Sequence, residues 1–318
     1  MSEWLEVRVV ERREEADDIV ALVLQSANGA PLPAYEAGAH IDVKLPNGLV
    51  RQYSLCGDPD RDDCYGLGIL KEANGRGGSL CVHEQLHEGS RIEISAPRNL
   101  FALAPARRSI LLAGGIGVTP ILAMAEQLSR AGSEFEMHYC VRTEERAAFR
   151  SRIASSPFAD CVHFHFDDRP GTRLDAASLL AAPEPETHVY VCGPDGFMDY
   201  VLSAARAAGW PESNIHFERF SGPVGEPGDD APFEIAVEGS DCMVSVAAGQ
   251  SALEALNAAG FDIPTSCEQG ICGTCLTEVV DGIPDHRDMF LSEAEQAAGD
   301  CFTPCCSRAL SSSLTIRI

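Results

Sequence analysis

Basic residues are scarce in this sequence of 318 amino acids. Lysine and arginine together number 24, against 48 aspartates and glutamates, which gives a formal net charge of −24 at pH 7. Such a charge repels phosphate backbones and anionic lipid heads, so it argues against nucleic acid and membrane surfaces as partners. The same charge favours association with basic patches on other proteins.

Long apolar runs are missing as well. The first 18 residues alternate charged with apolar side chains and offer no apolar stretch typical of a secretory signal. The run 109–125 is uncharged, but it contains three glycines and a proline and is slightly short for a membrane span. We therefore expect a soluble protein.

The sequence also lacks the cysteine pattern of a disulfide-stapled domain. Its 13 cysteines are an odd number, and they are spread from Cys56 to Cys306 instead of being concentrated in one short segment. Free thiols persist in a reducing compartment, so the expected location is the cytoplasm.

The first hundred residues predict a small antiparallel β domain, 1–104. Short runs of alternating apolar residues are separated by glycine and proline turns, which is typical of an antiparallel sandwich or barrel. These runs lie at 5–12, 18–26, 39–45, 50–57, 65–71 and 90–97.

A second domain, 105–222, alternates strands and helices. SILLAGGIG precedes the helix candidate VTPILAMAEQLSRAG, and HVYVCGP precedes DGFMDYVLSAARAAG, with EMHYCVR and HFHF between them. This alternation predicts a parallel sheet covered by helices.

A stretch rich in glycine, proline and aspartate, 223–231, predicts a linker to a third domain, 232–318. The third domain contains two alternating runs, a helix candidate at 251–260, a cysteine-rich loop and strand candidates at 276–282 and 313–318. This pattern predicts a small α+β unit.

Four cysteines of the third domain have a specific spacing. Cys267, Cys272 and Cys275 form CxxxxCxxC, and Cys305 follows after 29 further residues. This is the plant-type ferredoxin spacing, in which four thiolates hold two iron atoms. A structural zinc site is the alternative, although such sites usually take two CxxC pairs and only one is present here. Spacing alone leaves open whether Cys305 or the adjacent Cys306 is the fourth ligand.

Two turns of the second domain could bind a dinucleotide. AGGIGVTP joins an apolar strand to an amphipathic helix, where glycines admit a pyrophosphate and the helix N-terminus supplies free amides. VCGP ends another buried strand, and ligands of open α/β sheets bind at the carboxyl ends of strands. A tight corner without a ligand is the alternative for either turn alone, and AGGIGVTP is not GxGxxG. The predicted contacts are Gly114, Gly115, Gly117, Val118, Thr119, Pro120, Cys192, Gly193 and Pro194.

Two segments of the first domain could hold a flavin. In RQYSL, Arg51 offers a cation for a phosphate, Tyr53 a stacking face and Ser54 a hydrogen-bond donor. In the turn GRGGS, the backbone amides of Gly77, Gly78 and Ser79 could cradle a phosphate at a helix start. A core tyrosine and a hairpin loop are the alternatives for either segment alone.

With these segments in this order, the chain resembles the phthalate dioxygenase reductase family, including the vanillate demethylase reductases, over essentially its full length. The resemblance implies an antiparallel flavin-binding β-barrel, a ferredoxin-NADP-reductase-like parallel α/β domain and a C-terminal β-grasp ferredoxin domain. It is carried by RQYSL, GRGGS, GGIGVTP, VCGP, HFERF and CEQGICGTCLTEVVDGIPDHRD.

The resemblance also assigns residues. It implies FMN contacts at Arg51, Tyr53, Ser54, Ile69, Lys71, Gly77, Gly78, Ser79 and Thr119, with Phe220 of HFERF against the flavin. It places Cys192 near the nicotinamide, and no side-chain acid or base is expected to be required. The closing CCSR resembles the family's CxSR ending, which selects Cys305 as the fourth cluster ligand and leaves Cys306 spare.

The family most often uses FMN and NADH, whereas the residues themselves leave FAD and NADPH open. Arg142 and Arg146 could meet a ribose 2′-phosphate, while Glu144 and Glu145 oppose one by repulsion. We expect NADH, with Arg142 among its contacts.

Together the three cofactor signatures predict an electron-splitting reductase. NADH would give a hydride to the flavin, and the 2Fe-2S cluster would pass single electrons to the terminal oxygenase of a Rieske-type aromatic dioxygenase or O-demethylase system. The alternatives are a cytochrome P450 or a carnitine-type oxygenase as acceptor, a redox-sensing binding protein, and a zinc-stabilised interaction protein.

The third domain has the charge expected of an electron-donating partner. Between residues 232 and 318, 13 acidic residues stand against 3 arginines and no lysine, which gives −10. Such a face should meet a basic patch on the oxygenase. A merely solvated acidic face is the alternative.

Overall fold

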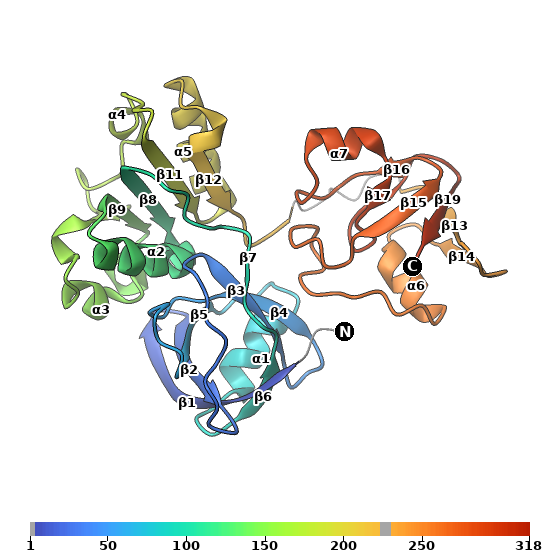
Figure 1. The fold of residues 1–318 in the computed structure, drawn as a ribbon, viewed down its shortest axis with the longest axis horizontal. Coiled ribbons are helices and arrows are strands. Elements are labelled where there is room, and N and C mark those ends of the chain that lie inside the picture. The colour runs from blue at the N-terminus through green and yellow to red at the C-terminus, as the bar shows by residue number, and fades with distance from the viewer. Residues whose placement is uncertain (1–3, 223–229) are drawn as a thin grey trace. The chain divides into compact units, whose positions relative to one another are not determined.

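The computed structural model describes residues 4–222 and 230–318. The chain divides into two compact units, the first ending at Arg219 and the second beginning at Phe220 (Figure 1). The first unit therefore contains the predicted β domain, 1–104, and all but the last three residues of the predicted α/β domain, 105–222. Most of the predicted linker, 223–229, lies outside the described residues.

An antiparallel sheet forms the N-terminal part of the first unit. The alternation seen in the sequence directs one face inward, so that Val7 and Val9 are buried while Glu6 and Arg8 are exposed. The strand order is β4-β3-β6-β1-β2-β5, and β7 pairs with β3. The elements are β1 (Leu5–Ala16), β2 (Ile19–Ser26), β3 (Ala39–Lys44), β4 (Val50–Ser54), β5 (Tyr65–Leu70), α1 (Gly78–Gln85), β6 (Arg91–Ile94) and β7 (Arg98–Asn99).

The two ends of this sheet meet at one backbone bridge, between Leu55 just after β4 and Leu67 in β5. The predicted antiparallel barrel is thus confirmed as a barrel-like sheet, with no continuous ladder closing the ring among the described strands.

A five-stranded parallel sheet of order β10-β9-β8-β11-β12 follows, as the alternation of strands and helices predicts. Helices α2 and α3 pack on one face, and α4 and α5 on the other. The elements are β8 (Arg108–Gly114), η1 (Gly115–Gly117), α2 (Val118–Ala131), β9 (Glu134–Val141), η2 (Glu144–Arg146), α3 (Arg150–Ala154), η3 (Ala159–Cys161), β10 (Val162–Phe166), α4 (Ala176–Leu179), β11 (Thr187–Cys192), α5 (Asp195–Ala207), η4 (Glu212–Asn214) and β12 (Ile215–Glu218).

One hydrophobic core joins the two sheets of the first unit. Helix α2 buries all of residues 118–125, and they share a cluster with Ile19 and Ala21 of β2 as well as with Met137 of β9. Burying one large aliphatic side chain contributes about 1.5–3 kcal/mol, so this shared core is a strong reason for the two sheets to form one unit.

The second unit contains a five-stranded mixed sheet of order β14-β13-β19-β15-β17. Strand β19 pairs parallel with β13 and antiparallel with β15, and α6 packs in the same core, which is the β-grasp arrangement that the resemblance implies. The elements are β13 (Phe233–Val237), β14 (Met243–Val246), α6 (Ala252–Ala258), β15 (Thr277–Asp281), β16 (Pro284–Asp285), α7 (Glu293–Ala298), β17 (Cys301–Phe302), β18 (Arg308–Ala309) and β19 (Ser313–Arg317).

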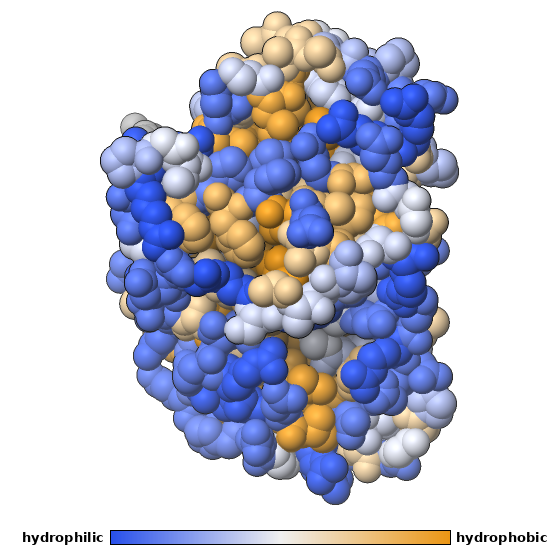
Figure 2. Space-filling model, turned by 90° about the vertical axis from the view of Figure 1, so that its left-hand side faces the viewer, coloured by the Kyte–Doolittle hydropathy of each residue, from blue (hydrophilic) through white to orange (hydrophobic). Residues whose placement is uncertain are grey.

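Hydrophilic side chains cover most of the face drawn in Figure 2, and apolar side chains gather in separate patches between them. Within the described ranges, every helix is too short or too polar to cross a membrane.

Candidate cofactor sites

The start of α1 and the side chain of Arg51 form a cradle for a phosphate. Gly77 begins the helix at φ 81°, and the first turn of α1 carries no acidic side chain and no side-chain cap in the described structure. A Cβ built on Gly78 would lie 2.6 Å from Arg51 Cγ and 2.9 Å from Arg51 Nε, so the arginine lies directly against the helix start. Free amides beside a guanidinium suit an anion, and these residues fit a flavin phosphate.

The other predicted flavin residues differ in their burial and contacts. Tyr53 on β4 is half-buried, and burial raises the pKa of its hydroxyl. Ser79 Oγ accepts a hydrogen bond from the Glu72 amide at 3.0 Å. Ile69 packs its side chain in the core of the barrel-like sheet, and its carbonyl lies 3.0 Å from His83 Nε2. Lys71 is exposed.

Ser54 connects the flavin strand to the nucleotide sheet. Its Oγ donates a hydrogen bond to Glu218 Oε2 at 3.3 Å, across 164 residues of sequence. Glu218 lies beside Cys192 in the parallel pairing of β12 with β11. Desolvation raises the pKa of Glu218 to about 8 although the Ser54 hydroxyl opposes the shift, so at neutral pH this carboxyl holds a proton. Burial, and then the nearby Glu218, raise the pKa of the Cys192 thiol well above its usual range.

The sequence pattern does not mark Glu218, whereas the resemblance assigns Phe220, two residues later in the same HFERF segment, to the flavin. Phe220 is the first residue of the second unit and is 38% exposed, so its contact with the flavin stays a prediction.

The predicted nucleotide turns meet where the strand order reverses, between β8 and β11. A Cβ on Gly193 would lie 2.9 Å from Gly114 Cα, and a Cβ on Gly117 would overlap the carbonyl of Cys192. These glycines therefore allow the two turns to approach each other. Gly115, at φ 53°, differs from them because a Cβ there would meet no described atom within 4 Å.

Helix α2 begins at this junction with Val118, Thr119 and Pro120, all buried. No acidic residue stands in its first turn, so the positive end of the helix dipole suits a pyrophosphate. The methyl group of Thr119 lies 2.9 Å from the Cβ position of Gly68 in β5, which places the turn against the flavin sheet. Pro194 precedes α5, and Arg142 is exposed directly after β9.

The thiols of the cysteine loop lie in two pairs. The Cys267 thiol hydrogen-bonds to Cys272 and lowers the pKa of Cys272 to about 5, while the same contact raises the pKa of Cys267. Cys305 contacts Cys275 in the second pair, and this contact raises the pKa of Cys305 to about 12. Two pairs of thiols suit a cluster of two irons, because each iron then takes two protein ligands.

Backbone amides of the loop point at these sulfurs. Gln269 N lies 3.3 Å from Cys267 Sγ, and Thr274 N lies 3.5 Å from Cys272 Sγ. Gly270 and Gly273, at φ 72° and 67°, give the loop the positive φ angles that it needs. Such amides stabilise negatively charged sulfur, so the donor set fits an iron-sulfur cluster.

Cys306 contacts the neighbouring Cys305 thiol. Its Sγ is 3.3 Å from Thr303 Oγ1 and occupies the direction in which a Cβ on Gly270 would point. Cys306 thus contacts Cys305, whereas Cys305 itself contacts Cys275. This arrangement favours Cys305 as the fourth ligand. All thirteen cysteines lie in the described part of the chain, and all are free thiols.

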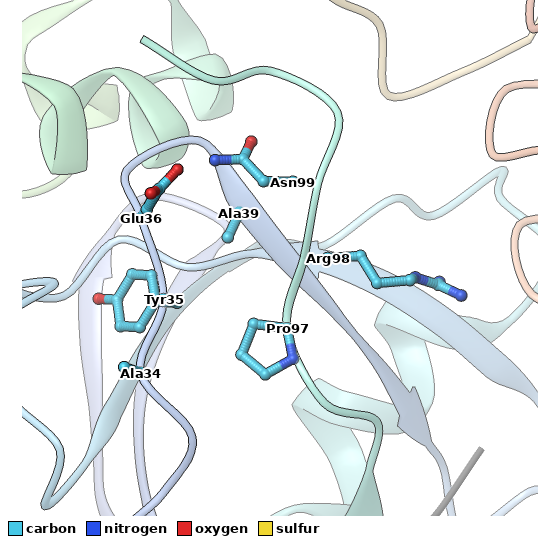
Figure 3. Close-up of a pocket in the computed structure, with 7 residues that line it drawn as sticks. All are labelled: Ala34, Tyr35, Glu36, Ala39, Pro97, Arg98 and Asn99. Carbon is cyan, nitrogen blue, oxygen red and sulfur yellow. The ribbon is translucent and has the colours of Figure 1, made fainter.

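A pocket of about 350 Å³ lies between the segment before β3 and the chain around β7. It is lined by Ala34, Tyr35, Glu36, Ala39, Pro97, Arg98 and Asn99. In Figure 3 the Arg98 side chain points away from the other lining residues. Its guanidinium binds the buried Asp42 carboxylate at 2.7 Å. The pocket therefore presents no cation to a ligand, and we assign it no function.

The barrel-like sheet and the parallel α/β sheet share one core, and a cysteine-loop domain follows them. This arrangement defines a modular electron-transfer reductase. A family model for the 2Fe-2S iron-sulfur cluster binding domain matches residues 235–310. A second model, for the N-terminal domain of dimethylamine monooxygenase subunit DmmA-like proteins, matches residues 96–215.

Full-length relatives make the class more specific. The chain is 50% identical to a vanillate O-demethylase oxidoreductase of Pseudomonas sp. (strain HR199), over 98% of this chain and 99% of the relative. The solved structure of phthalate dioxygenase reductase, described as modular for electron transfer from pyridine nucleotides to [2Fe-2S], superposes with a TM-score of 0.80 at 37% identity. That match covers 99% of this chain and 98% of the other. The chain therefore belongs to the phthalate dioxygenase reductase family, which confirms the resemblance read from its motifs.

An intact type IV self-sufficient cytochrome P450 monooxygenase also matches, with a TM-score of 0.84 at 40% identity over 99% of this chain. This chain spans only 41% of that larger protein. The match therefore bears on the reductase fold and does not identify the acceptor.

Proposed function

We propose that this protein is the NADH-dependent reductase component of a Rieske-type aromatic dioxygenase or O-demethylase system, with FMN and a 2Fe-2S cluster as cofactors. The observation that carries the proposal is the hydrogen bond from Ser54 to Glu218. It brings the flavin strand β4 to the carboxyl edge of the nucleotide sheet beside Cys192, where a nicotinamide and a flavin ring can lie against each other.

The residues at this junction position the reactants and hold one proton. Bound FMN supplies the conversion of a two-electron hydride into single electrons. The Glu218 carboxyl fixes the direction of the Ser54 hydroxyl and, because its pKa is raised to about 8, stays protonated at neutral pH. Cys192 stays a neutral thiol because burial raises its pKa, so it serves as a contact for the nicotinamide and not as a nucleophile.

Around this junction we assign the remaining contacts as the motifs predict. Arg51 with the Gly77–Ser79 turn takes the FMN phosphate, and Tyr53 takes a face of the ring. The turn at 114–120 and the Cys192–Pro194 turn take NADH. Support comes from the uncapped start of α1, from the start of α2 without acidic side chains, and from the guanidinium beside Gly78. We also keep the domain boundaries at 104/105, 222/223 and 231/232 as proposals.

Cys267, Cys272, Cys275 and Cys305 would hold the 2Fe-2S cluster. The family match at residues 235–310 and the two thiol pairs support this ligand set over zinc. Thirteen free thiols also support a reducing location, and we propose the cytoplasm.

The acceptor would dock beside the cysteine loop. Met289 and Phe290 are 45% and 37% exposed, although both are apolar. They lie against the loop, because Met289 N donates to Gly270 O at 2.9 Å and the Phe290 ring occupies the Cβ direction of Gly273. An apolar centre within a domain of charge −10 suits an oxygenase that presents an apolar patch with a basic rim.

The first experiment is an anaerobic NADH titration of the purified holoprotein, followed by visible absorption. We expect flavin and iron-sulfur bands that bleach together, FMN in the acid extract, and about two irons per chain. A colourless protein that contains zinc would refute the proposal. Ser54→Ala should slow bleaching by NADH at unchanged FMN content, because it removes the hydroxyl and leaves Arg51 in place.

A further inference from the structure

Four arginines gather at the carboxyl ends of β9 and β10. Arg142 directly follows β9, Arg146 and Arg150 lie in the η2 and α3 segments after it, and Arg169 follows β10. In nucleotide-binding α/β sheets, the adenosine ribose lies at the carboxyl end of the strand after the glycine-turn unit, where an acidic residue favours NAD and an arginine favours NADP. This edge therefore decides which nucleotide binds.

The carboxylate of Glu144 forms ion pairs with two of these arginines. Glu144 hydrogen-bonds through Oε1 to the Arg150 guanidinium and through Oε2 to that of Arg169. The two contacts, with Arg169 the larger cause, lower the pKa of the Glu144 carboxyl. Arg169 also stacks on the Phe166 ring, with 4.6 Å between its guanidinium carbon and the ring centroid. Both guanidiniums are thus held on Glu144 before any nucleotide arrives.

The other charges at this edge complete the field around Glu144. Arg146 pairs with Asp18 of the loop between β1 and β2, at 3.3 Å. Glu145, Asp167 and Asp168 are exposed carboxylates of the same edge. In the part of the chain that the structure describes, Arg142 makes no side-chain hydrogen bond or ion pair and stays available to a nucleotide phosphate.

We propose that Glu144 determines nucleotide specificity by holding Arg150 and Arg169, so that the chain accepts NADH and discriminates against NADPH. The inference rests on the proposed function, because it assumes that a nicotinamide dinucleotide binds at this sheet edge. A ribose 2′-phosphate requires charge-assisted hydrogen bonds from guanidiniums. Here two of the four guanidiniums at this edge already have a carboxylate partner, which a 2′-phosphate would have to displace before it could use them. A ribose 2′-hydroxyl carries no charge and requires no such exchange.

The test compares NADH and NADPH as reductants of the holoprotein. Glu144→Gln should raise the ratio of kcat/KM for NADPH to that for NADH by about tenfold, the effect of about one charge-assisted hydrogen bond. Glu145→Gln is the matched control, because it removes the same charge one residue away and leaves both arginines held. Its ratio should stay within about twofold of wild type, because exposed charges are screened. Adding Arg169→Ala to Glu144→Gln should return the ratio toward wild type.

A second readout does not depend on turnover. Calorimetric binding of adenosine 2′,5′-bisphosphate and of AMP to the holoprotein should show tighter bisphosphate binding in Glu144→Gln and unchanged AMP binding. Equal nucleotide ratios and equal bisphosphate affinities in Glu144→Gln and Glu145→Gln would overturn the inference. If neither nucleotide reduces the wild-type flavin, the proposed function fails, and the bisphosphate comparison still decides the role of Glu144.

Discussion

The protonated carboxyl of Glu218 should make the protein less stable as the pH rises. Desolvation raises its pKa from 4.5 to about 8 in the folded chain. Between these two values the folded state keeps a proton that the unfolded state has lost. The folded state therefore binds more protons, and the free energy of unfolding falls with increasing pH from about 4.5 to about 8. Below this window the effect is absent, and above it the loss is complete.

The size of the effect follows from the same two pKa values. Each pKa unit corresponds to about 1.4 kcal/mol, so the full difference corresponds to about 5 kcal/mol. The side chain is partly rather than fully buried, and water screening reduces this figure. Above pH 8, removing the titrating group in Glu218→Gln should raise the free energy of unfolding by about 2–5 kcal/mol relative to wild type. The altered hydrogen bond from Ser54 reduces this gain by about 1 kcal/mol.

Urea unfolding of the holoprotein between pH 5 and pH 9, followed by flavin fluorescence, measures this difference in the first unit. The gain of Glu218→Gln over wild type should be near zero at pH 5 and should increase toward pH 8. Glu212→Gln is a suitable control, because Glu212 is an exposed partner of Arg206 and its pKa is lowered. A difference between Glu218→Gln and wild type that stays constant from pH 5 to pH 9 would refute the reasoning.

Three further changes test the other sites. Cys305→Ser should abolish the iron-sulfur absorption and the electron paramagnetic resonance signal of the reduced protein, whereas Cys306→Ser should keep both; the reverse result would make Cys306 the ligand. Gly117→Ala should lower the thermal midpoint, at a cost of about 1–3 kcal/mol, because the new methyl group overlaps the Cys192 carbonyl, while Gly196→Ala in the open first turn of α5 should be neutral or stabilising. Arg51→Ala should lower the FMN content of the purified protein, measured by extraction, and normal content would remove Arg51 from the phosphate site.

The local pattern of apolar residues predicts many strands and helices of this fold. It misses elements that carry no such pattern. The alternating run 18–26 is β2, Ile19–Ser26. One face of this strand packs in the core of the barrel-like sheet, and the first residues of the other face pack in the core shared with α2. Helix α7, Glu293–Ala298, escaped prediction because none of its residues is buried and it carries no apolar stripe. Its signal is the capping box of Ser292 and Glu295, which satisfies the helix start without tertiary packing.

The sites divide in the same way. The cysteine loop is visible in the sequence because three of its thiols and the amides that point at them lie within ten residues. Glu218 is not visible, because a glutamate in HFERF resembles an exposed strand residue. Its raised pKa arises only when β12 pairs with β11 and meets Ser54 of a different sheet. Likewise, the spacing of Arg150 and Arg169 gives no hint that Glu144 holds both.

The charge distribution bears on which part of the chain the electron acceptor meets. Residues 232–318 carry 13 acidic and 3 basic residues, and residues 1–231 carry the remaining 35 and 21, so the two segments have charges of −10 and −14. The charge of −10 is spread over 87 residues and the charge of −14 over 231 residues. The negative charge per residue is therefore about twice as high in the cysteine-loop domain. A basic partner is therefore attracted most strongly to the domain that holds the cluster thiols. Electron transfer to the oxygenase should slow as salt rises from 50 to 500 mM. The rate of flavin reduction by NADH should change little over the same range, and it serves as the internal reference. Phe290→Ala should slow the first process alone, since that ring lies against the cysteine loop.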